Sequence, residues 1–451
     1  MAGRYKAYPE YKKSGINWIG SIPTLWKVVS LRHLISSVKN GSTATQTEQS
    51  ATSVPVSRIE TISTGHINMD KTGFVDPNSI SESFKLDAGD LLLSHINSLS
   101  MVGNVAQVQP NDFLFHGMNL LRIIPKESIS SKYLFWQLKS DYSRKLIESV
   151  AKPAINQASV STESLKALQM LLPSIEEQQK IANFLDHETA KIDTLIAKQE
   201  KLIELLKEKR QAVISHAVTK GLNPQAPMKD SGVEWLGEVP EHWSVKGFNH
   251  CAKIRGGLVD PKLEQYKDLV LYAPNHIEKE TGKVICKESA DAQGADSNKY
   301  LCFKGEVIYS KIRPALAKVA LCDEEVALCS ADMYPIDAYN GLTNTFLYWF
   351  LLSDSFTKAV VLDSDRVAMP KVNRESLGEY RVPVPPMDEQ LDICSSIKRQ
   401  SRILDELEDK ASYQIALMKE RKTALISAAV TGKIDVRHFV VEQGQPQGVQ
   451  G

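Results

Sequence analysis

The sequence predicts an α+β fold: two α/β globular domains separated by two long antiparallel helices that pair as a coiled coil, all related by a pseudo-twofold internal repeat. One observation is a helical stretch that occurs twice, since residues 168–222 match residues 380–434 identically at 17 of 55 positions with a constant shift of 212. A second is a tryptophan-containing segment that also occurs twice, each copy preceding a region of short apolar runs. This order indicates a duplicated unit of segment, domain and helix.

The tryptophan-containing segments, residues 14–26 (strap one) and 231–243 (strap two), precede the two globular regions. Four of the six tryptophans lie in the straps, beside Gly and Pro residues that favour turns. Tryptophans in such a setting can bind a ligand, but anchoring in the core of the following domain is the favoured interpretation.

The first globular domain, with its strap, is expected over residues 14–165 and the second over 229–377. Short apolar runs predict strands at Leu91–Leu93, Val102–Val108 and Leu120–Ile124, separated by Gly, Asn, Asp and Pro. Amphipathic helices are expected at Tyr133–Leu138 and Phe346–Leu352. Polar loops at 154–159 and 368–373 then lead toward the long helices.

The long helices are expected over residues 174–220 and 387–432. Ser174 and Glu177 form a capping-box pattern, and Gly221 and Gly432 follow the last apolar turns. Shared apolar positions at helical spacing predict the coiled-coil seam: Ile181, Leu185, Ile192, Leu195, Ile203, Leu206, Val213 and Ala217, matched by Ile393, Ile397, Leu404, Leu407, Ile415, Met418, Leu425 and Ala429. The Gly- and Gln-rich tail, residues 443–451, is expected to be disordered.

Composition limits the classes of function. The chain has 54 basic and 54 acidic residues, so nucleic-acid binding would have to depend on local patches. No apolar run of membrane-spanning length and no signal peptide is found, which predicts a cytoplasmic protein without membrane contact. All six cysteines lie in the second half without metal-ligand spacing, and buried free thiols are expected.

Motifs of catalysis are missing from the sequence. It contains no phosphate-binding glycine loop, no dinucleotide fingerprint, no zinc-protease motif and no nucleophile elbow. Glu408 and Lys410 have the spacing of a nuclease motif, but a solvated helix face is favoured there. We therefore expect a binding protein with no catalytic residues and no metal ligands.

Several motifs together carry a family resemblance. The pattern W-x-G-x-[IV]-P-x-x-W, a globular segment, P-x-x-E-Q and a long helix ending near Ala-Val-Thr occurs twice, and this order resembles the DNA-specificity subunit of type I restriction-modification systems. The second copy departs from the first, with Pro386 at the position of Ser174.

The resemblance implies that each globular segment is a target recognition domain that reads one half of a bipartite, asymmetric site in double-stranded DNA. It implies that the helices dock two methylation subunits, which bind S-adenosylmethionine and methylate adenine at N6, and that restriction subunits join the complex. It implies no cofactor in this chain.

Candidate DNA-contacting residues are those whose side chains suit base edges or phosphates and that lie in the predicted loops, since Arg and Lys suit guanine, and Asn and Gln suit adenine. In the first domain they are Arg58, His66, Asn68, Lys71, His95, Asn97, Ser98, Ser100, Asn119, Lys152, Asn156 and Gln157. In the second they are Asn275, His276, Lys279, Lys311, Arg313, Lys318, Arg366, Lys371 and Asn373.

Two other functions remain open on the sequence alone. A non-enzymatic coiled-coil scaffold with protein-binding globular ends is supported by the zero net charge. A self-contained methyltransferase or nuclease is disfavoured by the missing cofactor and metal motifs. Salt dependence separates DNA reading from protein scaffolding, because phosphate contacts release counterions.

Overall fold

The computed structural model describes residues 5–16, 19–98, 101–154, 157–364 and 371–440. The chain divides into two compact units: unit one contains residues 1–198 and 414–451, and unit two contains residues 199–413. The long helices α4 (Ile175–Lys220) and α8 (Met387–Val430) both contribute to both units. Each unit therefore combines one globular domain with parts of both long helices.

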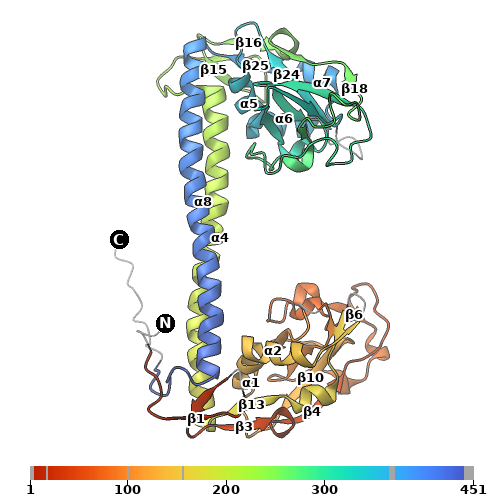
Figure 1. Cartoon of the computed structure of the whole chain (residues 1–451), viewed down its shortest axis with the longest axis vertical. Helices are drawn as coiled ribbons and strands as arrows, with labels where there is room; N and C mark the ends of the chain where they lie inside the picture. The colour runs from red at the N-terminus through yellow and green to blue at the C-terminus, as the bar shows by residue number, and fades with distance from the viewer. Residues whose placement is uncertain (1–4, 17–18, 99–100, 155–156, 365–370, 441–451) are drawn as a thin grey trace. The chain divides into compact units, whose positions relative to one another are not determined.

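The globular part of unit one (domain one) is built on a four-stranded sheet with the order β4-β10-β7-β9. Two of these strands, β4 and β10, are labelled in Figure 1. The strands of this unit are β1 (Tyr11–Lys13), β2 (Ser21–Pro23), β3 (Lys27–Ser30), β4 (Ile35–Asn40), β5 (Val54–Val56), β6 (Gly73–Val75), β7 (Leu91–Ser94), β8 (Ile96–Asn97), β9 (Val105–Gln107), β10 (Leu120–Pro125), β11 (Lys152–Ala154), β12 (Gln157–Ser159) and β13 (Gln169–Leu172). Its shorter helices are α1 (Ser131–Lys139), α2 (Asp141–Val150), α3 (Thr162–Ala167) and the 3-10 turns η1 (Leu31–His33), η2 (Glu60–Ile62), η3 (Met69–Lys71), η4 (Pro77–Ser79) and η5 (Glu82–Phe84).

The globular part of unit two (domain two) repeats this plan with a sheet of order β17-β24-β21-β22. Its strands are β14 (Met228–Asp230), β15 (Glu238–Pro240), β16 (Ser244–Gly247), β17 (Ala252–Ile254), β18 (Leu258–Val259), β19 (Leu271–Tyr272), β20 (Lys299–Phe303), β21 (Val307–Ser310), β22 (Val319–Leu321), β23 (Val326–Cys329), β24 (Met333–Ala338) and β25 (Arg381–Val384). Its shorter helices are α5 (Asn344–Leu352), α6 (Asp354–Ser364), α7 (Arg374–Glu379), η6 (Phe248–His250), η7 (Pro274–His276) and η8 (Pro314–Leu316). Domain two also contains a second four-stranded sheet, β18-β20-β23-β19, and this is where the two copies diverge most.

The glutamine of the P-x-x-E-Q motif joins each globular domain to its long helix. Gln178 accepts a hydrogen bond from Ser130 N, just before α1, and donates to Pro173 O, both at 3.0 Å. Gln390 accepts from Thr343 N, just before α5, and donates to Pro385 O, both at 2.9 Å. One buried side chain therefore satisfies backbone groups on two elements in each copy.

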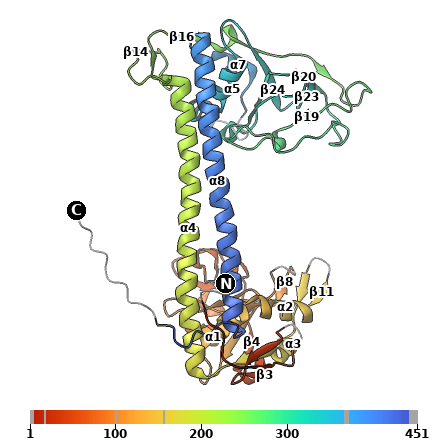
Figure 2. The same cartoon turned by 60° about the vertical axis from the view of Figure 1, so that its left-hand side comes forward.

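Segments of α4 and α8 lie side by side within each unit (Figures 1 and 2). The α4 position that carries Arg210 corresponds to Lys422 of α8, 212 residues later, and Asp193 corresponds to Asp405. In unit one Lys422 Nζ bonds both carboxylate oxygens of Asp193, at 2.6 and 2.7 Å. In unit two the buried Arg210 bonds Asp405 at 2.5 Å and Glu408 at 3.0 Å. Both pairings join the N-terminal part of one helix to the C-terminal part of the other, so the helices are antiparallel in each unit.

The predicted seam is only partly right. Ile181, Leu185, Ile393 and Ile397 are fully buried, but Leu195 and Leu407 are 48% and 42% exposed and lie outside the seam. Glu408 is also not part of a solvated face, because it accepts from Arg210 across the seam. Apolar residues spaced three or four apart occur both in the buried seam and on the exposed side of the helices beside it, so the spacing alone did not identify the seam.

The ends of the long helices have the expected caps, with one difference. Ser174 Oγ accepts from Glu177 N at 3.3 Å, but the Glu177 carboxylate accepts from Tyr8 Oη at 2.6 Å, so only half of a capping box forms. α8 starts directly after Pro386, whose carbonyl accepts from Gln390 N at 3.0 Å. Gly221 and Gly432 both adopt a positive φ, of 75° and 70°.

The straps pack as the sequence predicts. Trp26 and Trp243 are buried, and a Cβ atom on Gly432 would lie 2.4 Å from Pro23, while one on Gly221 would lie 3.2 Å from Trp243. Each strap therefore covers the C-terminal end of a long helix, strap one on α8 and strap two on α4. Trp18 lies outside the described residues.

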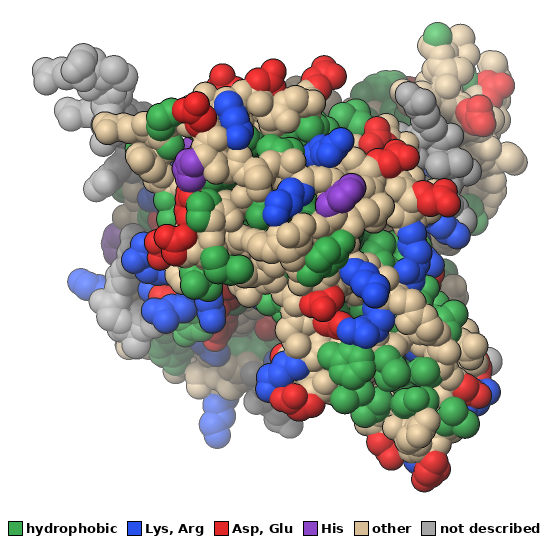
Figure 3. Space-filling view, turned by 90° about the horizontal axis from the view of Figure 1, so that it is seen from above, with side chains coloured by type: hydrophobic (Ala, Val, Ile, Leu, Met, Phe, Trp, Pro, Cys, Tyr) green, Lys and Arg blue, Asp and Glu red, His purple; other side chains and the backbone are tan. Residues whose placement is uncertain are grey.

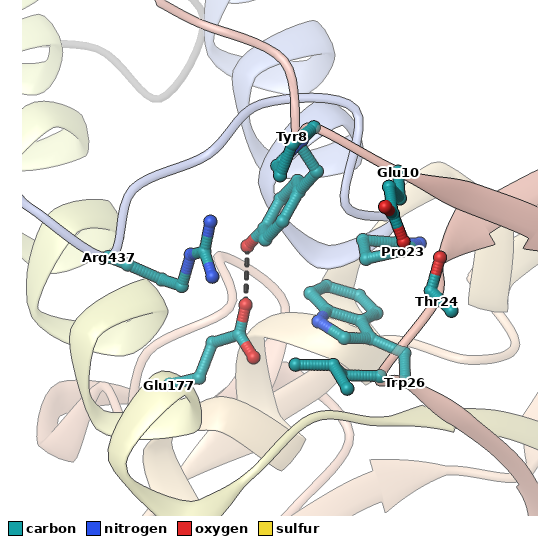
Figure 4. A pocket seen from close by; sticks show the side chains of 9 residues that line it. Tyr8, Glu10, Pro23, Thr24, Trp26, Glu177 and Arg437 are labelled. Carbon is teal, nitrogen blue, oxygen red and sulfur yellow. Dashed lines mark hydrogen bonds between the residues drawn. The ribbon is translucent and has the colours of Figure 1, made fainter.

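The N-terminal and C-terminal segments meet in unit one. Asp435 N donates to Lys6 O at 2.7 Å, and Tyr11 Oη donates to Gly432 O at 3.0 Å. Figure 4 shows a pocket beside this junction, where Tyr8 bonds Glu177 and the Arg437 guanidinium lies 4.9 Å from the Tyr8 ring centroid. The tail from residue 443 onward lies outside the described residues.

Candidate DNA interface

A loop cluster follows strand β21 in domain two and contains three of its candidate contacts, Lys311, Arg313 and Lys371. Lys311 comes directly after β21, and its carbonyl accepts from Val372 N at 2.9 Å, while Ile312 forms a β-bridge with Lys371. Lys311 N donates to Asp332 O, directly before β24, at 3.0 Å. The structure therefore brings the segment with Lys311 and Arg313 together with Asp332 and with Lys371, which are distant from it in sequence.

Two arginines, Arg313 and Arg374, belong to this cluster. Arg313 is exposed and adopts a left-handed backbone with φ 48° before the turn η8. Arg374 donates to the carbonyls of Ile254 and Arg255 at 3.2 and 2.8 Å, and stacks at 5.2 Å on the Tyr334 ring. Lys311 Nζ lies 5.5 Å from the same ring, so cation–π contacts help to hold its direction.

The other candidates of domain two adjoin this cluster through the turn η8. Lys318 Nζ donates to Pro274 O, and Glu280 N donates to Leu316 O, which places Asn275 and Lys279 beside the turn. Both side chains are exposed. Asn373 accepts from Ser376 N at 2.7 Å, so it caps α7 and its carbonyl oxygen is occupied.

His276 is not an accessible contact. The side chain is buried, with 3% of its surface exposed, and its ring nitrogen donates to Leu271 O at 3.1 Å. The sequence predicted an exposed loop residue, whereas His276 is buried and bonds Leu271 of strand β19 in the second sheet.

Domain one has a matching cluster after strand β7. The His95 carbonyl accepts from Val160 N at 2.9 Å, and β8, which contains Asn97, pairs with β12, which begins at Gln157. Lys152 joins through the β11–β12 hairpin, so the expected polar loop at 154–159 contains strand residues instead. Burial and the bond to the Asn119 backbone act in opposite directions on His95, and burial dominates and lowers the pKa of its imidazole.

A second group of domain one candidates borders this cluster. Gly117 N donates to Ser57 Oγ at 2.9 Å, which sets the chain around Asn119 next to Arg58. Arg58 N donates to Thr61 Oγ1, which in turn donates to Lys71 O. Lys71 and Asn68 therefore lie at the edge of this second group. Asn68 is half-buried and caps η3 through Asp70 N. Ser98 is exposed beside Asn97.

His66 lies apart from the cluster. It lines a crevice against α4 with Trp136, Asp186 and Asp193. Nearby Lys139 lies over the Phe135 and Trp136 rings, and burial lowers the pKa of its ammonium group to about 8. Three further candidates, Ser100, Asn156 and Arg366, lie outside the described residues.

Sequence reasoning missed three residues of the clusters. Met118 is exposed next to Asn119, Asp332 is exposed next to Lys311, and Arg374 stacks on Tyr334. Asp332 could have been found because it precedes β24 as Asn119 precedes β10. Met118 has an apolar side chain and therefore does not match the polar residue types that suit base edges.

Charges of both signs are mixed on one face of the molecule. On the face drawn in Figure 3, Lys and Arg side chains are interspersed with Asp and Glu side chains instead of forming one continuous basic area. Positive charge for phosphate contacts is thus local, as the zero net charge implies.

In the part of the chain that the structure describes, no group of three or more His, Cys, Asp and Glu side chains is placed to hold a metal ion. None of the helices in this part combines the length and the apolar composition that crossing a bilayer requires. Five of the six cysteines are buried, whereas Cys286 is exposed, contrary to expectation.

These features define a class: a duplicated two-domain binding protein in which matching loop clusters carry different polar side chains and each domain is fixed to a helical pair. The family model described as the type I restriction modification DNA specificity domain matches residues 23–205 and again 240–426. The chain belongs to this family, and it is a specificity subunit of the type I restriction-modification class, a recognition subunit and not a catalytic one.

Individual proteins and solved structures are similar to most of this chain. The EcoDI type I restriction enzyme specificity subunit of Escherichia coli is 27% identical over 92% of this chain and 90% of its own length. A solved structure from work on assembly and conformational transition of the type I restriction-modification system has a TM-score of 0.69 at 13% identity, covering 92% of this chain and 99% of that one. The HsdS subunit from Thermoanaerobacter tengcongensis has a TM-score of 0.51 at 14% identity, covering 92% and 98%. At these identities the two structures show the shared fold.

Proposed function

We propose that the chain reads a bipartite, asymmetric site in double-stranded DNA, one half with each globular domain, residues 14–165 and 229–377. The observation that carries the proposal is the pair of loop clusters. They occupy matching places after β7 and β21, yet present different side chains: His95 and Asn97 in one, Lys311 and Arg313 in the other. Matching scaffolds with different polar surfaces suit two readers of different sequences.

The test maps methylated adenines across the genome of a host that carries this chain with its methylation partner. We expect one motif of two specified halves separated by a fixed unspecified gap. Methylation at a continuous motif, or methylation that is unchanged when the chain is omitted, would contradict the proposal.

The proposal also assigns partners. Two methylation subunits, which bring S-adenosylmethionine and methylate adenine, would dock on the helical pair, and restriction subunits would complete a cytoplasmic complex. An apolar patch on the helices of unit two supports docking: Leu202, Leu205, Ile403 and Leu407 are 42%, 48%, 51% and 42% exposed. Leu202, Leu205 and Ile403 each precede an apolar seam residue, and Leu407 precedes Glu408, which bonds Arg210 across the seam. The four side chains therefore follow one flank of the antiparallel pair.

Co-purification with the methylation subunit tests the patch. Leu205→Lys combined with Leu407→Lys should reduce recovery of the partner at least tenfold, because two charges would enter an apolar contact. The matched control is Leu263→Lys, since Leu263 is equally exposed, at 48%, but lies in domain two. Loss of the partner in the control alone, or in neither variant, would assign docking elsewhere.

A protein-binding scaffold is the second candidate function, favoured by the mixed surface charge. Affinity of the assembled complex for its mapped DNA site, measured between 50 and 200 mM salt, separates the two. DNA reading predicts a steep linear fall of log affinity with log salt concentration. A flat dependence would support the scaffold.

A further inference from the structure

The two loop clusters can be superposed residue by residue from their hydrogen bonds. Leu120, which starts β10, is opposite Ser94, and Met333, which starts β24, is opposite Ser310. The residue after each of these serines, His95 or Lys311, accepts from the corresponding valine, Val160 or Val372, at 2.9 Å. Four positions are therefore matched across the domains: His95 with Lys311, Asn97 with Arg313, Met118 with Ala331, and Asn119 with Asp332.

In domain one, Met118 and Asn119 are held rigidly while their side chains are exposed. Gly117 passes so close to the neighbouring chain that a Cβ atom there would lie 2.0 Å from Ser57 O, and Gly41 approaches Gly117 O just as closely. Asn119 adopts a left-handed φ of 68°. Met118 is 47% exposed, a large apolar side chain next to Asn119 in the chain.

In domain two the same four positions have a different chemistry. Lys311 and Arg313 are cations, Asp332 is an exposed carboxylate, and Ala331 has no side chain that could reach a base. Arg313 is in the left-handed region, as Asn119 is, so its direction is also set by the backbone.

Base edges in the major groove differ in what they offer to these two sets. Adenine takes the amide of Asn at N6 and N7, and thymine presents a methyl group to apolar side chains. Guanine takes Arg or Lys at O6 and N7, and cytosine donates from N4 to Asp. We infer that the half-site read by domain one is specified mainly by A·T pairs and that the half-site read by domain two contains at least one G·C pair. This inference rests on the proposed function and gives the substrate class of each domain.

Met118 and Arg313 are the specificity-determining residues that carry the inference. Met118 lies beside Asn119, so a thymine methyl group in contact with the thioether would lie next to an adenine edge in contact with the amide. Arg313 with Asp332 nearby offers a donor and an acceptor to the two bases of one G·C pair. Apolar contact at position 118 has no counterpart in domain two, because Ala331 replaces it.

Mapped methylation motifs of the whole complex test the assignment. Apart from the adenine that is methylated, the wild-type motif should be mainly A·T in one half and contain G·C in the other. Arg313→Asn, which retains a residue that tolerates the left-handed backbone, should relax a G·C position. Met118→Ala should relax an A·T position in the other half.

A relaxed A·T position in Arg313→Asn, a relaxed G·C position in Met118→Ala, or no relaxed position in either variant would overturn the inference. In each of these results the bipartite motif itself survives, so the proposed function stands. Loss of specificity in both halves from either single substitution would instead count against separate reading by the two domains.

Binding to synthetic duplexes gives a second test that does not depend on methylation. Replacing thymine by uracil removes the 5-methyl group and keeps base pairing. In the half read by domain one, the wild-type complex should lose about fourfold in affinity per contacted methyl group, and the Met118→Ala complex should show no such loss. Equal losses in both complexes would remove Met118 from the contact, and no loss in the wild type would do the same.

Discussion

His116 shows how burial of one side chain makes domain one sensitive to pH. The imidazole is 1% exposed and donates from Nε2 to Leu120 O at 3.0 Å. Burial lowers the pKa of His116 to about 4, although the hydrogen bond to the carbonyl opposes the shift. The fold therefore requires the neutral ring at a position just before β10.

We predict that the unfolding free energy falls between pH 7 and pH 5. The unfolded imidazole, with a pKa near 6.5, takes up a proton before the folded one does, so stability from this group is complete above pH 6.5 and is lost as pH falls toward 4, by about 1–2 kcal/mol at pH 5. Urea unfolding at both pH values measures this. His116→Asn should be less stable at pH 7 but show a smaller difference between the two values, and an unchanged difference would refute the assignment.

Gly432 is the residue on which strap one depends. Its φ is 70°, and any Cβ atom would lie 2.4 Å from Pro23. We predict that Gly432→Ala lowers the unfolding free energy by about 2 kcal/mol or more, measured by denaturant midpoint, since strain and overlap add. Gly232→Ala is the control, because φ is 72° but no atom lies within 4 Å, and it should cost about 1 kcal/mol. Equal losses would show that the contact with Pro23 is unimportant.

Among the elements, the long helices pair through matched but unequal ion pairs. Arg210 is buried between Asp405 and Glu408, with Lys283 also 2.9 Å from Asp405, whereas the matching Lys422–Asp193 pair has a 47% exposed carboxylate. The two units thus fix the same helical pairing with different amounts of burial.

This difference gives a prediction with an internal control. Arg210→Ala should lower the unfolding free energy by about 2–3 kcal/mol, because Glu408 loses its cation in a largely buried place. Lys422→Ala should lower it by no more than about 1 kcal/mol, because its pair is screened by solvent. Thermal unfolding of both variants decides, and a larger loss for Lys422→Ala would contradict the account.

Some of the strands and helices could be predicted from the sequence, and others could not. Strands β7 and β10, helices α1 and α5 and the two long helices were predictable because their apolar periodicity is strong and their caps are local. The second sheet of domain two was not predictable, since its strand β19 pairs in parallel with the distant β23. For the same reason His276 was assigned to an exposed loop although it is covered.

The sequence predicted where the loop clusters lie in the chain better than it predicted which residues belong to them. His95 and Lys311 were found from sequence as polar residues of predicted loops, and the segments Ser94-His95-Ile96 and Ser310-Lys311-Ile312 match in the two copies. That Asp332, Arg374 and Met118 join them depends on strand register and on the close passage of Gly117 past Ser57. Neither can be read from residue spacing.

For the whole molecule, the contact between the N-terminal and C-terminal segments in unit one predicts that the chain tolerates circular permutation. Residues 221–231 connect the end of α4 covalently to strap two. The hydrogen bonds from Asp435 to Lys6 and from Tyr11 to Gly432 hold strap one beside the end of α8 without a covalent connection. A circular permutant that joins the C-terminus to Met1 and opens between Gly221 and Lys229 should assemble and methylate the same motif. If it assembles and recognises another motif or none, the repeat is not equivalent in the way that we describe.

The central claim is that the two domains read DNA independently, and paired variants test it most directly. Methylated adenines would be mapped genome-wide for the wild-type complex, for Lys311→Ala with Arg313→Asn in domain two, and for His95→Ala with Asn97→Ala in domain one. Each variant should relax one half of the motif, at about 1–3 kcal/mol per lost bidentate base contact, while the other half and the gap stay the same. Equal loss of specificity in both halves from either variant, or an unchanged motif in both, would contradict the claim.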